Sequence, residues 1–243
     1  MRNRDYHNIK AIFYREMLTT FSSPIALIFF LVFAALSGYF FTSTFFIIGQ
    51  SELRNLFGVI PLFFLVLIPA ITMNMVSRDW NLGTMEIMTT LPITDYEYIL
   101  GKFIAAITLV ITSLSFTIVH LFTVYRFGTE IDTGAILCGY FGLILLGAFY
   151  SAIGIFASSL FENNVQALML SFGIIFVFFM MDKVLIFVPS ASLSSIMQYM
   201  SVEFHLSNIS RGVLDTRNII YFISMSYLFV NLSVRSLESR QWR

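Results

Sequence analysis

Long stretches of the chain contain no charged residue, and these stretches predict its main helices. Charges are missing from residues 17–51, 55–77, 103–125, 133–161, 163–181, 184–202 and 218–234. A helix that crosses about 30 Å of hydrocarbon needs roughly 20 mostly apolar residues, so each stretch has the length of a span. The stretch 184–202 is excluded, because Pro189 and the polar run 190–195 interrupt it. Six membrane-spanning helices are therefore expected, at about 24–48, 56–77, 98–125, 134–160, 165–188 and 218–236.

The composition agrees with a protein embedded in lipid. Of the 243 residues 58% are hydrophobic and only 12% are charged, whereas a soluble domain carries about 25% charged residues. Only helices and closed barrels satisfy their backbone hydrogen bonds in hydrocarbon, and the alternating ten-residue segments of a barrel are absent. The sequence therefore predicts an all-α membrane protein in which residues 1–243 form a single transmembrane domain.

The segment before the first span has the pattern of an amphipathic helix. Over residues 6–22 the apolar positions recur at spacings of three and four, at Ile9, Ile12, Phe13, Met17 and Phe21. Lys10, Arg15 and Glu16 are expected to face elsewhere. We expect this helix to lie along the membrane interface; the alternative is a frayed extension of the first span.

The segment 189–213, between the fifth and sixth spans, predicts short interfacial or re-entrant helices. It combines the break at Pro189 with the apolar residues Ile196, Met197, Met200, Phe204 and Leu206. Glu203 and His205 lie two positions apart in this segment, and we expect them to be solvated.

The loop between the second and third spans, residues 77–94, predicts a short helix. Gly83 and Pro92 punctuate the loop, and about two helical turns between them carry one carboxylate, Glu86, and the apolar residues Met85, Ile87, Met88 and Leu91. A helix of this length is unstable alone in water, so it must dock on something. Thr94 and Glu97 then have the spacing of a capping box at the start of the third span.

Lysine and arginine are divided unequally between the two sides that six spans define, with Lys183 near the end of the fifth span. Nine lie on the side that holds both termini, namely Arg2, Arg4, Lys10, Arg15, Arg78, Lys102, Arg235, Arg240 and Arg243, and four lie on the other, namely Arg54, Arg126, Arg211 and Arg217. Because cytoplasmic loops carry the excess of these residues, both termini are expected in the cytoplasm.

Within the spans, packing explains most polar and small residues. Gly147, Ser151, Gly154 and Ser158 give the fourth span a small-residue face, which should pack tightly against another helix of the same subunit or of a partner. Asp182 and Lys183 favour an interfacial anchor over a substrate site, because Lys can extend to the interface.

No pattern in the chain points to catalysis or metal binding. His7, His120 and His205 fall in three different compartments, and the single cysteine, Cys138, lies in an apolar run. A glycine-rich phosphate-binding loop is missing, since Gly101 and Lys102 are followed by Phe103. Net charge is zero, which gives no indication of a nucleic-acid partner. We therefore expect neither an enzyme nor a metal site, and no cofactor bound by this chain.

Several runs of residues resemble the permease subunits of type-2 ABC exporters, the ABC-2 family. They are LIPAITM at 67–73, LGTMEIMTTLPI at 82–93, LGKF at 100–103, YFGL at 140–143 and SAIGIFASSL at 151–160. With Glu162, Asn163 and the run FSSP at 21–24, the chain looks most similar to the gliding-motility-associated branch. That family often has two adjacent acids after the second span. Here Arg78 precedes Asp79, so only Asp79 matches.

The resemblance implies a half-transporter of six spans with an interfacial N-terminal helix and a cytoplasmic coupling helix between spans two and three. It implies a second permease subunit, identical or related, and a separate ABC ATP-binding subunit that holds ATP and Mg²⁺. The residues that it assigns to coupling with the ATPase are Asp79, Gly83, Thr84, Met85, Glu86, Thr89 and Pro92. Glu86 would contact the ATPase; alternatively, it is a solvated carboxylate without a partner.

The expected location is the bacterial cytoplasmic (inner) membrane, where lipid is a further partner. With few charges inside the membrane, we expect a lipidic, amphipathic or envelope-polymer substrate. One alternative stays open, in which the ATPase drives a membrane scaffold or force-transmitting module of an envelope or gliding-motility complex and no substrate crosses.

Overall fold

The computed structural model describes residues 2–47, 53–85, 91–128, 132–185 and 191–241. These residues form helices and no strand, and six helical segments are long and apolar enough to cross a membrane. The predicted fold class, an all-α protein with six spans, is confirmed. The six segments are Pro24–Ile47, Arg54–Asn81, Asp95–Phe127, Thr133–Leu160, Asn164–Val184 and Thr216–Arg240.

Three of the six spans are not single regular helices. The first is α2 (Pro24–Thr42), which continues as the π-helix η1 (Ser43–Ile47). The second consists of α3 (Arg54–Thr72) and, after a break, the short α4 (Ser77–Asn81). The third consists of α6 (Asp95–Phe116) and α7 (Ile118–Phe127). The second span therefore extends past the predicted end at residue 77, and Asp79, predicted in a loop, lies on a helix.

The remaining spans are α8 (Thr133–Leu160), α9 (Asn164–Val184) and α12 (Thr216–Gln241). The described part of the fifth span ends at Val184, short of the predicted residue 188, and residues 186–188 lie outside the described residues. Between α9 and α12, the predicted short helices are present as α10 (Ala191–Met200) and α11 (Val202–Ser210). The N-terminal segment forms α1 (Arg2–Phe21).

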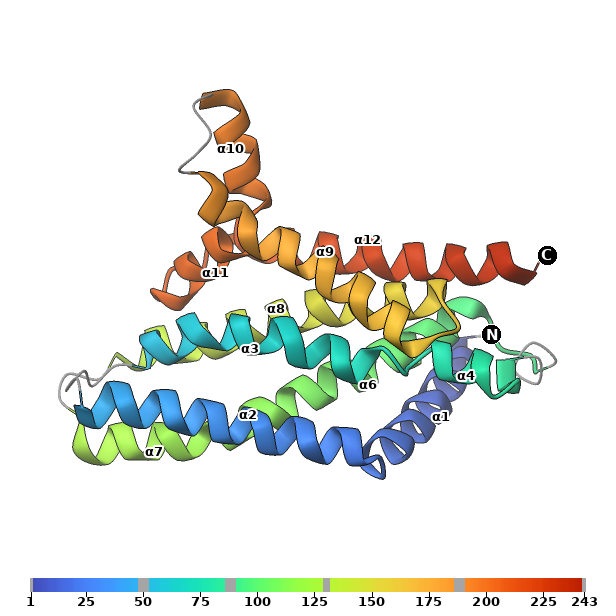
Figure 1. Ribbon diagram of the computed structural model, residues 1–243, viewed down its shortest axis with the longest axis horizontal. Helices are drawn as coiled ribbons and strands as arrows, with labels where there is room; N and C mark the ends of the chain where they lie inside the picture. The colour runs from blue at the N-terminus through green and yellow to red at the C-terminus, as the bar shows by residue number, and fades with distance from the viewer. Residues whose placement is uncertain (1, 48–52, 86–90, 129–131, 186–190, 242–243) are drawn as a thin grey trace.

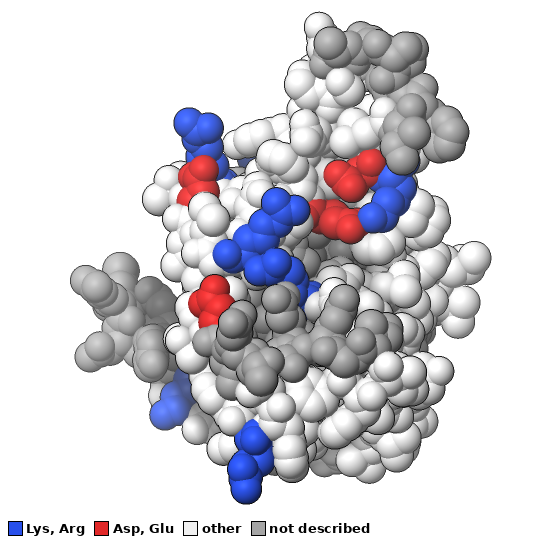
Figure 2. Space-filling model, turned by 90° about the vertical axis from the view of Figure 1, so that its left-hand side faces the viewer, with Lys and Arg blue, Asp and Glu red and all other residues white. Residues whose placement is uncertain are grey.

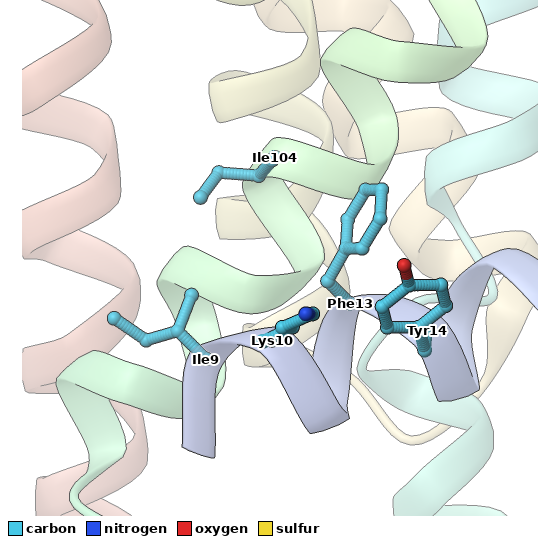
Figure 3. A pocket seen from close by; sticks show the side chains of 5 residues that line it. All are labelled: Ile9, Lys10, Phe13, Tyr14 and Ile104. Carbon is cyan, nitrogen blue, oxygen red and sulfur yellow. The ribbon is translucent and has the colours of Figure 1, made fainter. Parts of the chain in front are cut away.

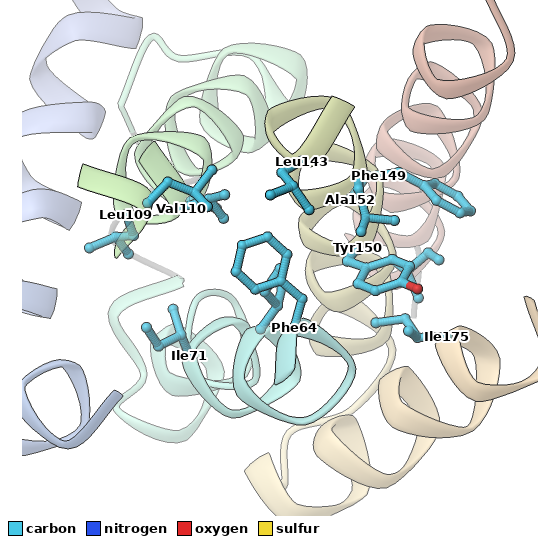
Figure 4. Packing of buried hydrophobic residues seen from close by; sticks show 14 of the residues in the cluster. Phe64, Ile71, Leu109, Val110, Leu143, Phe149, Tyr150, Ala152 and Ile175 are labelled. Carbon is cyan, nitrogen blue, oxygen red and sulfur yellow. The ribbon is translucent and has the colours of Figure 1, made fainter. Parts of the chain in front are cut away.

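Helix α8 is the centre of the bundle and packs against α12, α3, α9 and α6. Figure 4 shows the core between these helices, with Phe64 of α3, Val110 of α6 and Phe149 of α8 among the buried side chains. Two glycines of α8 allow close approach. A Cβ atom on Gly147 would overlap Val110, and one on Gly154 would overlap the hydroxyl of Thr72.

Helix α1 is separate from the first span. Ser23 ends the connection and caps α2, its hydroxyl accepting a hydrogen bond from the Ile25 amide at 3.3 Å. The prediction of a distinct helix is confirmed, and the alternative of a frayed extension is wrong. Along α6, α1 packs so closely that a Cβ on Gly101 would lie 2.7 Å from Ile12 Cγ2. Figure 3 shows an open groove beside this contact, lined by Ile9, Lys10, Phe13, Tyr14 and Ile104.

Both termini lie at one end of the bundle, which we call the termini end, and α10 and α11 lie at the other (Figure 1). Figure 2 looks onto this other end, where acidic and basic side chains are scattered over a mostly uncharged surface. Here Lys183 pairs with Glu203 at 2.8 Å. The prediction that His205 is solvated is wrong: its side chain is buried, and its ring nitrogens lie 2.7 Å from Asn218 Oδ1 and 2.8 Å from the Tyr199 carbonyl oxygen.

Candidate functional site: a buried charged cluster beside the loop between spans two and three

Five side chains at the termini end form what we call the charged hub, namely Arg15, Glu16, Asp79, Tyr98 and Lys102. Its centre is Lys102 on α6, which is only 1% exposed. The Lys102 ammonium lies 2.8 Å from Glu16 Oε2 on α1 and 2.8 Å from Asp79 Oδ2 on α4. It also donates a hydrogen bond to the Met75 carbonyl oxygen. A single lysine thus joins three helices.

Asp79 is the second centre of the hub. Tyr98 donates its hydroxyl to Asp79 Oδ2 at 2.5 Å, and Arg15 donates to Oδ1 at 2.9 Å. Thr84 donates its hydroxyl to the same Oδ1 at 3.0 Å, which ties the loop that follows α4 to the hub. The buried charges of Glu16, Asp79 and Lys102 are balanced by the Arg15 guanidinium, whose side chain is 41% exposed. Removing one partner of such a pair typically costs about 3–5 kcal/mol, because the other charge is left unpaired.

A break in the second span sets the position of Asp79. Helix α3 ends at Thr72, and the chain turns before α4 begins at Ser77. Ser158 of α8 replaces the missing helical hydrogen bonds: its hydroxyl oxygen accepts from the amides of Val76 and Ser77, both at 3.0 Å, and donates to the Met73 carbonyl oxygen at 2.8 Å. Buried backbone groups need such partners, so Ser158 fixes where the helix restarts.

The loop after α4 begins with a turn at Gly83. Its φ of 66° lies in the left-handed region that glycine adopts without strain. Thr84 and Met85 are helical, and Met85 is buried. The coupling helix predicted between Gly83 and Pro92 includes residues 86–90, which are not among the described residues. The predictions for Glu86 and Thr89 therefore lie outside what the structure describes.

The far end of this loop is held by α1. Asn8 donates its amide to the Pro92 carbonyl oxygen at 3.3 Å and to Glu97 Oε2 at 3.2 Å. Glu97 and Thr94 form the predicted capping box, with bonds of 2.9 and 3.3 Å, and this prediction is confirmed. Because Arg15 contacts Asp79 at the other end, one helix contacts both sides of the loop.

A second set of contacts holds α4 from the opposite side. Asn81 donates to the Glu162 carbonyl oxygen at 2.6 Å, and Ser77 donates to Asn164 Oδ1 at 2.6 Å. Arg240 of α12 donates to the Leu160 carbonyl oxygen and lies 5.1 Å from the centre of the Trp80 ring. The turn between α8 and α9 and the end of α12 therefore also fix α4.

The structure brings some of the sequence-predicted residues together. Thr84 donates a hydrogen bond to Asp79, and Met85 follows Thr84 directly. Gly83 and Pro92 lie near the two ends of the loop. The small-residue face of α8 points into the subunit. Gly154 and Ser158 lie against the broken second span, whereas the buried Ser151 hydroxyl has no hydrogen-bond partner among the described residues.

Sequence reasoning missed Glu16 and Lys102. The prediction that Glu16 faces away from the apolar side of the N-terminal helix is wrong, because the residue is 9% exposed and its carboxylate pairs with Lys102. The sequence feature that could have indicated the hub is Lys102, a lysine in the apolar segment that includes Leu100 and Phe103. A lysine in such a segment needs a buried acid.

The charged hub is suited to connecting helices rather than to binding a metal ion. Its carboxylates are occupied by cations and hydroxyl donors, and within the described ranges no group of three or more His, Cys, Asp or Glu side chains could hold a metal ion. What the arrangement can do is attach the two described ends of the loop, residues 82–85 and 91–94, to α1 and α6, and attach α4 to α8 through Ser158.

Comparison with protein families gives one match. The family model described as "ABC-2 family transporter protein" matches residues 10–210, a range that includes the whole hub and the loop beside it. No curated protein matches the chain significantly.

Proposed function

The chain belongs to the ABC-2 family of transporter proteins, whose members are membrane-spanning components, and on this premise we propose that it is the permease subunit of an export-type ABC transporter. ATP hydrolysis by a separate subunit would drive movement of the substrate. In this proposal the loop 82–94, including Glu86 and Thr89, receives the ATPase, and the ATPase binds ATP and Mg²⁺.

The observation that carries this proposal is a chain of two contacts. Thr84 donates a hydrogen bond to Asp79, and Asp79 forms an ion pair with Lys102. A displacement of the loop reaches α6 through Lys102, α1 through Arg15, and α8 through Ser158. Packed interiors resist continuous deformation and change by discrete shifts of packed elements. A push on the loop would therefore tilt spans against one another, which is the motion that alternating access requires.

The same proposal places the termini end in the cytoplasm of a bacterial inner membrane. The described parts of the loop, residues 82–85 and 91–94, and both termini lie at this end (Figure 1), and most Lys and Arg residues are assigned to this side by the six-span topology. A second permease subunit, identical or related, would complete the transporter. We also propose membership of the gliding-motility-associated branch, which is supported only by the sequence motifs that resemble it.

Mild-detergent purification of the tagged chain from its native membrane tests the proposal. We expect an ATP-binding subunit to co-purify in stoichiometric amount and to hydrolyse ATP. Asp79→Asn should lower ATP-driven transport in proteoliposomes, whereas Glu238→Gln, an exposed carboxylate on α12 at the same end, should leave it unchanged. Recovery without an ATPase, under conditions that keep other membrane complexes intact, would refute the permease assignment. Hydrolysis with no transported lipid or polymer would favour the force-transmitting scaffold.

A further inference from the structure

Two neighbouring hollows form a crevice between α1 and the broken second span, which we call the α1–α3 crevice. Their volumes are about 100 and 30 Å³, and Glu16, Thr19, Asn74, Met75 and Arg78 belong to both linings. The larger hollow has room for several water molecules, and hence for a phosphate group.

Arg78 is a cation of this crevice whose guanidinium is available to bind an anion. Its side chain is exposed, and its guanidinium makes no ion pair or hydrogen bond with residues of the described ranges. The two acids of the lining are already engaged, because Glu16 and Asp79 both pair with Lys102. Asn74 and Thr19 add neutral polar groups beside Arg78. An anion entering the crevice therefore meets an available guanidinium, the group best suited to bidentate binding of phosphate.

The crevice is also amphipathic along its length. Beyond the shared residues, its smaller hollow is lined by Ile25 at the start of α2 and Ile71 at the end of α3, together with the hydroxyl-bearing Thr20 and Ser23. Ile25 and Ile71 belong to the apolar parts of membrane-spanning segments, whereas Arg78 lies past the break, near the end of the second segment, Arg54–Asn81. The crevice thus combines apolar side chains from two spans with a cation from the end of the second span.

From this arrangement we propose that the α1–α3 crevice binds the phosphate-bearing headgroup of an anionic lipid in the leaflet at the termini end. A lipid satisfies both parts of the crevice, since its phosphate pairs with Arg78 and its glycerol and upper acyl chain cover Ile25 and Ile71. A soluble phosphate would leave the apolar walls exposed.

The groove in Figure 3 fits this ligand less well. Its one cation, Lys10, lies 5.8 Å from the centre of the Tyr14 ring, and the other lining residues, Ile9, Phe13 and Ile104, offer no further polar side chain. This groove supplies a control position for the experiment, because Lys10 is also an exposed cation at the same end.

Lipid in the crevice would also act on the charged hub. Arg15, Glu16, Asp79 and Lys102 all line the larger hollow, so a bound phosphate adds negative charge directly beside them. Binding is expected whether or not an ATPase is attached. Only the further step, that the lipid alters coupling, rests on the proposed function.

Native mass spectrometry of the intact purified protein, reconstituted with phosphatidylglycerol and then delipidated, tests the binding. Wild type should retain one phosphatidylglycerol per permease subunit. Arg78→Gln should bind it about tenfold more weakly, the loss of one charge-assisted contact, and Arg78→Lys should recover part of the difference. Lys10→Gln and Arg235→Gln, both at exposed positions, should bind as wild type does.

Equal retention by Arg78→Gln and wild type, at equal thermal stability, would overturn the proposal. Displacement of the lipid by millimolar glycerol phosphate would overturn the lipid assignment and indicate a site for soluble phosphate. Loss of retention in the Lys10→Gln control alone would move the site to the groove of Figure 3. If lipid binds as expected and no ATPase co-purifies, the proposed function fails and the lipid site stands.

Discussion

Lys102 and Asp79 form an ion pair of 2.8 Å in the interior of the protein, where each side chain is at most 6% exposed. The pair joins the third span to α4, the short helix at the end of the second span, and Glu16 adds α1 to it. Both acids share this one lysine, and Asp79 has Arg15 as a second cation. The structure therefore concentrates the attachment of three helices in one side chain.

Lys102→Met should destabilise the protein strongly. The substitution leaves Glu16 and Asp79 buried near each other without their shared cation, and about 3–5 kcal/mol of unfolding free energy should be lost. Thermal unfolding in nanodiscs measures the change. Arg235→Met, at an exposed position on α12, is the control and should change stability by less than about 0.5 kcal/mol. Similar unfolding temperatures for the two variants would contradict the role of the ion pair.

Ser158→Ala should weaken the junction between the second span and α8. The amides of Val76 and Ser77 lose their acceptor, at an expected cost of about 1–3 kcal/mol. Ser159→Ala is a closely matched control, because its side chain is equally buried but its hydroxyl bonds only to Phe156 of its own helix. Hydrogen exchange at residues 73–77 should accelerate in Ser158→Ala alone; acceleration in both variants would point to a general loosening of α8.

Gly154→Ala should destabilise through steric overlap. The added methyl group would overlap the Thr72 hydroxyl, and forcing α3 and α8 apart should cost about 1–3 kcal/mol. At Gly173 of α9, apart from the chain neighbours and the backbone of the same helix, no atom of the described residues lies within 4 Å of the position of an added Cβ. Gly173→Ala should therefore be neutral or slightly stabilising, since alanine is the better helix former. Thermal unfolding of both variants distinguishes local overlap from a general intolerance of alanine.

Thr84→Val should uncouple the loop from the hub without unfolding the protein. The substitution removes the hydrogen bond to Asp79 and keeps the volume of the side chain. In proteoliposomes that contain the ATPase, transport per ATP hydrolysed should fall several-fold. Thr108→Val is the control, because the Thr108 hydroxyl bonds only to the Ile104 carbonyl oxygen of its own helix. Unchanged coupling in Thr84→Val would show that force reaches the spans by another route.

The six spans were predictable from sequence because the length of a charge-free stretch reports directly on membrane thickness. The break after Thr72 was not, since it depends on Ser158 of α8, which is remote in sequence and lies in an apolar segment of its own. The capping box of Thr94 and Glu97 is local and was found. The hub was missed, because a pair such as Glu16 and Lys102 has no local spacing that could identify it.

The contact of α1 with both sides of the loop 82–94 has a consequence for biogenesis. Arg15 and Glu16 precede Asp79 and Lys102 in the chain, so they leave the ribosome before Asp79 and well before Lys102. Until the third span has inserted, Glu16 has no lysine partner, and α1 can dock fully only when α6 arrives. A nascent chain halted after α4 therefore lacks the cation that pairs with the Glu16 carboxylate, whereas Asp79 can still pair with Arg15. Such a chain is chemically distinct from a finished one, which gives the cell a basis for recognising an incomplete protein.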